Sequence, residues 1–141
     1  MHLRVEPCYL VLNKQRKHAI DTRGIRQFLA QVTAFQGIAA SALSVVFISD
    51  SVMQDYNRKY RGMDKPTDVL SFRGDADYLG DILISAETAY EQARRSSVLT
   101  FETNIRRLVL HGVLHLAGYD HETDNGEMRA IERRMRRKFQ C

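Results

Sequence analysis

Residues 101–121 read FETNIRRLVLHGVLHLAGYDH, and they contain three of the five histidines of the chain. Apolar side chains occupy nearly every face of a helix drawn through residues 101–117, which predicts a helix buried at the centre of the molecule. His111 and His115 are four positions apart, so their imidazoles share one face of this helix, one turn from each other. Gly118 favours a break after them, because glycine adopts the left-handed conformation that ends a helix at little cost.

After this break the chain can return His121 to the same point, so that three imidazoles converge on one position. Three neutral imidazoles are typical of a divalent metal site, with zinc as the first expectation. Three protein ligands also leave one coordination position open, as in catalytic zinc sites. We therefore predict that His111, His115 and His121 bind one zinc ion, although nickel or another transition metal suits the same ligands.

The histidine spacing matches the H-E-x-x-H-x-x-G-x-x-H pattern of the metzincin peptidases except at its second position. Gly112 occupies that position, where the peptidases carry the Glu that acts as general base. The sequence thus keeps the metal ligands and lacks the peptidase base, and we expect Gly112 to open space beside the metal for a bulky substrate. Asp120, next to His121, either orients a ligand imidazole or is a turn residue.

Size and composition indicate one domain spanning residues 1–141, of which 44% are apolar. The longest apolar run is too short to cross a bilayer, and residues 1–7 lack the apolar segment of a signal peptide, so we expect a cytoplasmic protein without a membrane partner. Cys8 and Cys141 are expected to be reduced thiols. The net charge of +4 suits a partner rich in phosphate, but by itself it is a weak indicator.

The apolar patterns elsewhere predict helices and strands in the order β-α-β-α-β-β-α-α-α. The predicted strands are residues 9–12, 43–48, 68–72 and 81–84. The predicted helices have N-caps at Asp21 or Thr22, at Asp50, at Ser85, at Thr100 and near Asp124, the last with Glu127 in a capping box. This order implies parallel crossovers in the first part and a hairpin in the middle. We therefore predict an α+β fold with a four-stranded mixed, mostly parallel sheet and helices packed on it.

Arg61 begins the loop of residues 61–68, most of which we expect to be an exposed connection between a helix and a strand. Arg61 is the exception, because the planar guanidinium group of arginine binds a phosphate through two parallel hydrogen bonds. The last helix is strongly basic. We expect its basic side chains to form either a solvated face or a surface for phosphate contacts. Its basic residues are Arg129, Arg133, Arg134, Arg136, Arg137 and Lys138. The tyrosines show no spacing that indicates a surface for stacking bases.

Three blocks of the sequence together resemble the YbeY family of bacterial rRNA maturation endoribonucleases. They are residues 111–121 (HGVLHLAGYDH), 60–72 (YRGMDKPTDVLSF) and 79–85 (LGDILIS), and the resemblance covers essentially the whole chain. It implies an α+β fold with a zincin-like central metal-binding helix and a zinc ion on the three histidines. It also implies a single-strand-specific endoribonuclease that acts in 16S rRNA 3′-end maturation and ribosome quality control, with rRNA, the small ribosomal subunit and associated proteins as partners.

With this resemblance we predict metal-dependent hydrolysis of RNA phosphodiesters, with Arg61 and His111 as catalytic residues. Arg61 would stabilise the charge that develops on the phosphate. The absent Glu matters less than in a peptidase, because an RNA phosphodiester has a better leaving group than a peptide. Two alternatives remain: a metallopeptidase that uses another residue as base, and a non-catalytic ribosome-assembly factor whose metal only stabilises the fold.

Overall fold

The computed structural model describes residues 8–38, 42–75, 77–120 and 122–141. Within these ranges the elements follow the predicted order. They are β1 (Tyr9–Asn13), α1 (Thr22–Phe35), β2 (Ala42–Ile48), α2 (Asp50–Arg61), β3 (Val69–Arg73), β4 (Tyr78–Ser85), α3 (Ala86–Arg94), α4 (Phe101–Leu116) and α5 (Glu127–Phe139). Of the helices described, none has the length and apolar character to cross a bilayer.

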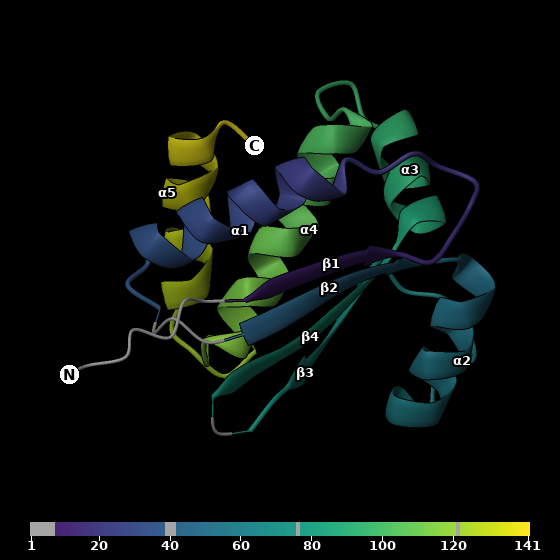
Figure 1. Cartoon of the computed structure of the whole chain (residues 1–141), viewed down its shortest axis with the longest axis horizontal. Helices are drawn as coiled ribbons and strands as arrows, with labels where there is room; N and C mark the ends of the chain where they lie inside the picture. Colours follow the sequence, from purple (N-terminus) through teal and green to yellow (C-terminus); the bar gives the residue numbers. More distant parts are fainter. Residues whose placement is uncertain (1–7, 39–41, 76, 121) are drawn as a thin grey trace.

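The four strands form one sheet in the order β1-β2-β4-β3 (Figure 1). β2 pairs in parallel with both β1 and β4, whereas β3 pairs antiparallel with β4 through the hairpin that joins them. The prediction of a mixed, mostly parallel sheet in an α+β fold is therefore confirmed. β3 lies at one edge of the sheet, and this position becomes important for the site described below.

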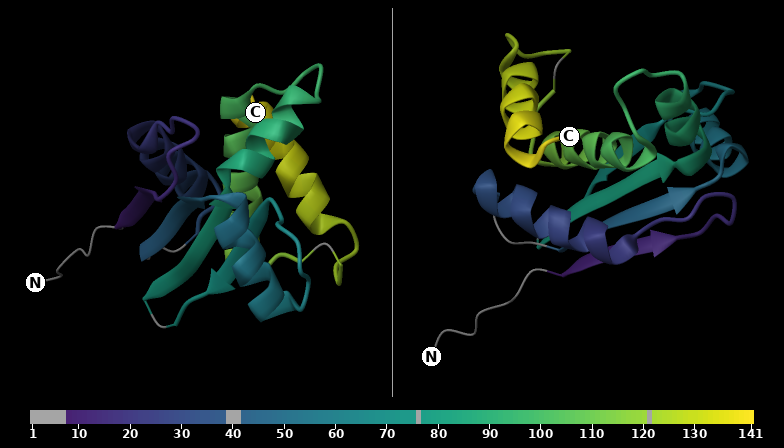
Figure 2. Two further views of the ribbon diagram at one scale, coloured as in Figure 1. Left: turned by 90° about the vertical axis from the view of Figure 1, so that its right-hand side faces the viewer. Right: turned by 90° about the horizontal axis from the view of Figure 1, so that it is seen from above.

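The two faces of the sheet are covered unequally (Figures 1 and 2). Helices α1, α4 and α5 lie on one face and enclose the main core with alternate residues of the strands, such as Ile82 and Ile84 of β4. Leu83 points to the opposite face, because successive side chains of a strand alternate between the two faces. There it packs with Met53 of α2 and Leu70 of β3 in a second, smaller cluster.

Helix α4 crosses the sheet closely at Gly112, which is buried. A Cβ atom added at Gly112 would lie 2.8 Å from Cγ2 of Ile82 in β4, so only glycine allows this close packing of helix on strand. The expectation that Gly112 opens space beside a metal is therefore wrong, because position 112 faces the sheet. Gly118, with a φ of 103°, follows α4 as the predicted break.

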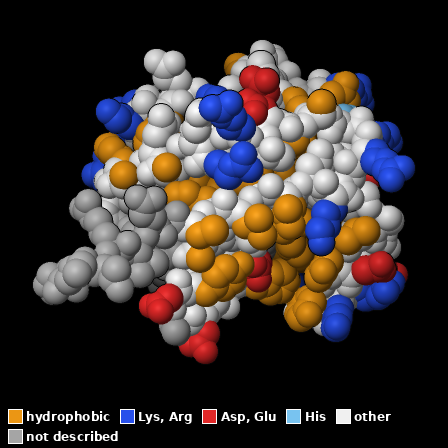
Figure 3. Space-filling model, in the orientation of Figure 1, with side chains coloured by type: hydrophobic (Ala, Val, Ile, Leu, Met, Phe, Trp, Pro, Cys, Tyr) orange, Lys and Arg blue, Asp and Glu red, His pale blue; other side chains and the backbone are white. Residues whose placement is uncertain are grey.

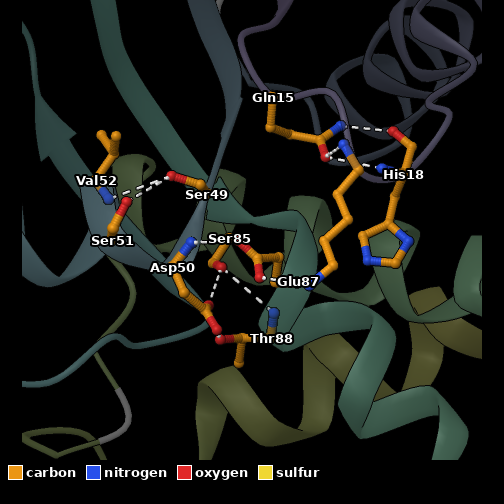
Figure 4. A network of polar contacts seen from close by, with 10 residues as sticks. Gln15, His18, Ser49, Asp50, Ser51, Val52, Ser85, Glu87 and Thr88 are labelled. Atoms are coloured by element: carbon orange, nitrogen blue, oxygen red, sulfur yellow. Dashed lines mark hydrogen bonds and ion pairs between the residues drawn. The ribbon is translucent and has the colours of Figure 1, made fainter.

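The N-cap of α2 is Ser49 and not the predicted Asp50. Ser49 Oγ accepts a hydrogen bond from the Val52 backbone N–H, which satisfies one of the free donors of the first turn. The Asp50 carboxylate instead accepts hydrogen bonds from Ser85 Oγ and, at 2.6 Å, from Thr88 Oγ1 (Figure 4). Asp50 thus ties the start of α2 to the start of α3.

Helix α5 begins at Glu127, and the predicted capping box at Asp124 is wrong. Gly126 precedes the helix with a φ of 96°, so the chain turns sharply there and enters the helix later than predicted. Asp124 nevertheless stabilises this turn, because its carboxylate accepts hydrogen bonds from the backbone N–H groups of Gly126 (2.8 Å) and Met128 (2.9 Å).

Candidate active site

An open cleft of about 540 Å³ lies between the C-terminal half of α4, the edge strand β3 and the loop that follows α2. His111 and His115 of α4 line it together with Arg61, the last residue of α2, and Ser71 and Arg73 of β3. The other lining residues are Thr67, Asp68, Val69, Leu70, Leu116, Tyr119, Asp120 and Glu122. The fold therefore brings Arg61 to the same cleft as the histidine pair, although they are far apart in the sequence.

The histidine pair has the geometry that the four-residue spacing predicts. The Nε2 atoms of His111 and His115 are 3.0 Å apart, and the ring centroids are 4.6 Å apart at an interplanar angle of 72°. Two nitrogen ligands of a tetrahedral zinc ion, each at about 2.0–2.1 Å from the metal, would be about 3.3 Å apart. The pair therefore fits two adjacent positions of such a site with little adjustment.

The predicted third ligand, His121, lies outside the described residues, so the three-histidine site stays a prediction. Among residues 8–38, 42–75, 77–120 and 122–141, no three His, Cys, Asp or Glu side chains form a group that could hold a metal ion. The structure thus places His111 and His115 together and does not test the third ligand.

Glu132 of α5 holds the imidazole of His111 from the side opposite the cleft. Its Oε1 lies 3.1 Å from His111 Nδ1, and its other oxygen, Oε2, accepts a hydrogen bond of 3.1 Å from Arg136 Nη2. A carboxylate at this distance favours the tautomer with the proton on Nδ1, which leaves the lone pair of Nε2 directed at the cleft. Metal-binding histidines commonly have this arrangement.

Glu132 is only 7% exposed. Burial alone would raise the pKa of its carboxyl group, but the hydrogen bond from His111 and the guanidinium group of Arg136 together lower it. Glu132 is not among the site residues predicted from the sequence. The available signal was a carboxylate one helical turn after Met128, on the apolar face of an otherwise basic helix that also buries Met135.

The basic side chains of the cleft lie on the wall opposite α4, which is formed by α2 and β3. Among the described residues, the Lys and Arg side chains that line it are those of Arg61 and Arg73, and both residues are exposed. The loop after Arg61 is anchored by the buried Asn57, whose Nδ2 donates a hydrogen bond of 2.8 Å to the Lys65 carbonyl oxygen. Arg73, the last residue of β3, places its Nη2 3.5 Å from the carbonyl oxygen of His115.

The basic face of α5 does not contribute to this wall, since no described residue of α5 lines the cleft. Arg136 is half-buried and bonded to Glu132, so the expectation of a fully solvated or phosphate-binding basic face is wrong for this residue. Asp120 lines the cleft, but its Oδ1 accepts a hydrogen bond of 3.0 Å from the Glu122 backbone N–H. That contact is typical of a turn residue.

These features define a class of protein: an α+β domain whose central helix presents a histidine pair, backed by a buried carboxylate, to a cleft with arginines on its opposite wall. The family model described as Endoribonuclease YbeY matches residues 10–140. The chain belongs to this family, which confirms the resemblance inferred from the three sequence blocks.

Known relatives cover almost the whole chain. A protein of Geobacter sulfurreducens named Endoribonuclease YbeY is 38% identical over an alignment of 138 residues, and the match covers 92% of this chain and 91% of the relative. A protein of the same name from Aquifex aeolicus is 38% identical over 122 residues, covering 83% and 81% of the two chains. The solution structure of TM1509 from Thermotoga maritima aligns with a TM-score of 0.65 at 30% identity and covers 89% of this chain and 85% of that one.

Proposed function

We propose that this protein is a metal-dependent endoribonuclease that hydrolyses phosphodiester bonds in single-stranded regions of rRNA. The observation that carries this proposal is the placement of the His111–His115 pair and of Arg61 and Arg73 on opposite walls of one cleft. A bound metal that activates water and positive side chains that stabilise the charge on the phosphate both favour hydrolysis of a phosphodiester. The names of the relatives, which describe enzymes that cut within RNA chains, support the choice of substrate.

The proposed cofactor is one zinc ion held by His111, His115 and His121, with nickel or another transition metal as a substitute. The two Nε2 atoms 3.0 Å apart support two of these ligands, and the H-x-x-x-H-x-x-G-x-x-H spacing supports the third. We further propose a cytoplasmic role in 16S rRNA 3′-end maturation and in ribosome quality control, at the small ribosomal subunit. This part of the proposal follows from the family.

When bound, the metal would supply an activated water and polarise a phosphoryl oxygen. The protein contributes the orientation of its own groups. Glu132 keeps the proton of His111 on Nδ1, so that Nε2 is the ring nitrogen that coordinates the metal, and Arg136 holds Glu132 in place. Arg61 and Arg73 bind the phosphate oxygens and stabilise the negative charge that develops on them, and Arg61 is positioned for this by the anchored loop that follows it.

The metallopeptidase alternative needs a general base other than residue 112, where the peptidases carry their Glu. A side chain at this position would start against Ile82 in the core, and the close packing of α4 on β4 explains the glycine without reference to a substrate. The assembly-factor alternative makes a different prediction, namely a protein that binds metal and folds around it but does not cut RNA.

The deciding experiment combines metal analysis of the purified protein with a cleavage assay on single-stranded RNA. We expect His115→Ala to lose both the bound metal and RNA cleavage, because it removes one of the paired Nε2 ligands. His18→Ala is the matched control, since His18 stacks on Tyr90, does not line the cleft and should leave both properties unchanged. Cleavage by metal-free wild-type protein would contradict the proposal, and metal binding without cleavage would favour the assembly factor.

A further inference from the structure

We propose that Tyr56, Tyr60 and Phe72 form a platform on which bases of single-stranded RNA stack as the strand leaves the cleft. This inference rests on the proposed function for its choice of RNA as the occupant. Below, these three residues are called the aromatic platform. It is a binding surface outside the cleft, built from α2 and the edge strand β3.

Two of the three rings of the aromatic platform are stacked, and the third meets them edge-on. Tyr56 and Tyr60 are one helical turn apart on α2, with ring centroids 6.1 Å apart and an interplanar angle of only 14°. The ring of Tyr60 meets that of Phe72 edge-on, with centroids 5.0 Å apart at 65°. The expectation that the spacing of the tyrosines indicates no stacking surface is therefore wrong for this pair, while Phe72 comes from a different element, β3.

Both tyrosines of the aromatic platform expose part of their rings to solvent. Phe72 packs against the small apolar cluster on the α2 side of the sheet, and Tyr60 partly covers it. Tyr60 is 54% exposed and Tyr56 is 38% exposed, so both rings have area in contact with solvent that a base can cover. In Figure 3 hydrophobic side chains gather on this side of the molecule, over the strands and towards α2, with Lys and Arg side chains close to them.

The platform is continuous with the cleft through two connections along the chain. Tyr60 directly precedes Arg61, which lines the cleft. Phe72 lies between Ser71 and Arg73, whose side chains line the cleft on the opposite face of β3. Because β3 is the edge strand, a strand of RNA bound at Arg61 reaches the platform by passing over this edge.

The charges around the platform match a nucleic acid. The Lys59 ammonium group lies 5.4 Å from the centroid of the Tyr60 ring, and Arg61 follows on the same helix. Arg58 is the exception, because its guanidinium group pairs with Asp55 at 3.0 Å and with Asp64 at 3.6 Å. Aromatic rings interleaved with cations are the usual composition of surfaces that bind single strands by stacking and by backbone attraction.

The test uses a short single-stranded oligoribonucleotide with 2-aminopurine, a base whose fluorescence is quenched by stacking, placed in turn at each position. Binding is read by stopped flow directly after mixing with the metal-loaded full chain, before cleavage products accumulate. We expect quenching at one or two positions outside the cleavage site, and an abasic nucleotide there should lower the affinity by roughly 5- to 150-fold per lost stack. Tyr56→Leu/Tyr60→Leu should abolish the quenching, lower the affinity for intact RNA equally and remove the discrimination against the abasic strand.

Tyr90→Leu is the matched control, since Tyr90 is an exposed tyrosine (43%) in an aromatic cluster on α3 that does not line the cleft, and it should bind RNA as the wild type does. Wild-type affinity of the Tyr56→Leu/Tyr60→Leu variant, or equal affinity for intact and abasic strands at every position, would overturn the platform. This result is separable from the proposed function. If the wild-type protein cleaves RNA but shows no base stacking, only the proposal of the aromatic platform is contradicted. If it stacks bases but does not cleave RNA, only the proposed nuclease activity is contradicted.

Discussion

The two walls of the cleft are built in opposite ways. On the α4 wall, the histidine pair belongs to a helix that is packed against the sheet at Gly112 and fixed from behind by the buried Glu132. On the wall formed by α2 and β3, Arg61 and Arg73 are exposed. The difference indicates a division of tasks: the first wall fixes the geometry of a coordinating group before substrate arrives, and the second supplies exposed positive charge that can contact substrate.

The strongest test of this comparison is on the exposed wall. We expect Arg61→Ala to lower kcat/KM for single-stranded RNA by about 10²–10³-fold, the usual effect of removing one group that stabilises transition-state charge, without a change in stability. Arg61→Lys should recover only part of the loss, because an ammonium group keeps the charge and loses the two parallel hydrogen bonds.

Arg58→Ala is the matched control for Arg61, since Arg58 is an exposed arginine of the same helix that pairs with Asp55 and Asp64 and does not line the cleft. The measurement is kcat/KM for single-stranded RNA, determined by steady-state kinetics for Arg61→Ala, Arg61→Lys and Arg58→Ala. Equal losses for Arg58→Ala and Arg61→Ala would mean that only the overall charge of α2 matters, and the two walls would not differ as described.

The second test is on the buried wall. Glu132→Gln retains the shape of the side chain and removes the charge that Arg136 and His111 share. We expect the affinity for zinc to fall by about 10- to 100-fold, the typical effect of changing a group that orients a metal ligand. Competition with a chromogenic chelator measures this affinity independently of RNA cleavage.

Glu127→Gln serves as control for Glu132→Gln, because Glu127 lies on the same helix and is exposed. The NMR shifts of the His111 ring nitrogens provide a second readout that a merely structural role would not move. If Glu132→Gln keeps wild-type zinc affinity and the same tautomer at His111, then Glu132 does not position the ligand.

The two walls also differ in how far the sequence predicts them. Local patterns sufficed for α4: the apolar residues around its full circumference predicted its burial, and the four-residue spacing predicted that His111 and His115 meet. Local patterns also placed the strands, because each has a run of apolar residues between turn residues. The predicted N-caps at Asp50 and Asp124 were wrong. Ser49 caps α2 instead, and the left-handed Gly126 precedes α5.

Local patterns could not predict contacts between residues that are far apart in the sequence. Glu132 meets His111 across two helices, and Arg73 reaches the cleft only because β3 is the edge strand. Neither relation has a fixed sequence spacing. The prediction for Gly112 was wrong for a different reason. The motif suggested that this glycine makes room beside the metal, whereas in the structure it lies against Ile82 of β4.

The smallest expected effect tests that last point. Gly112→Ala brings a Cβ atom to 2.8 Å from Ile82, and overpacking of this kind typically costs about 1–3 kcal/mol, partly offset by the gain of about 1 kcal/mol for alanine over glycine in a helix. We therefore expect the free energy of unfolding to fall by about 1 kcal/mol in urea denaturation, with RNA cleavage per folded molecule unchanged.

The matched background is Ile82→Ala, which removes all three side-chain atoms that the added Cβ would meet. In that background Gly112→Ala should become neutral or stabilising, because only the helix propensity of alanine remains. An equal loss of stability in both backgrounds would show that the contact with Ile82 is not what requires glycine. A loss of cleavage without a loss of stability would mean that residue 112 acts in the active site. The two walls of the cleft would then not differ in their tasks as described.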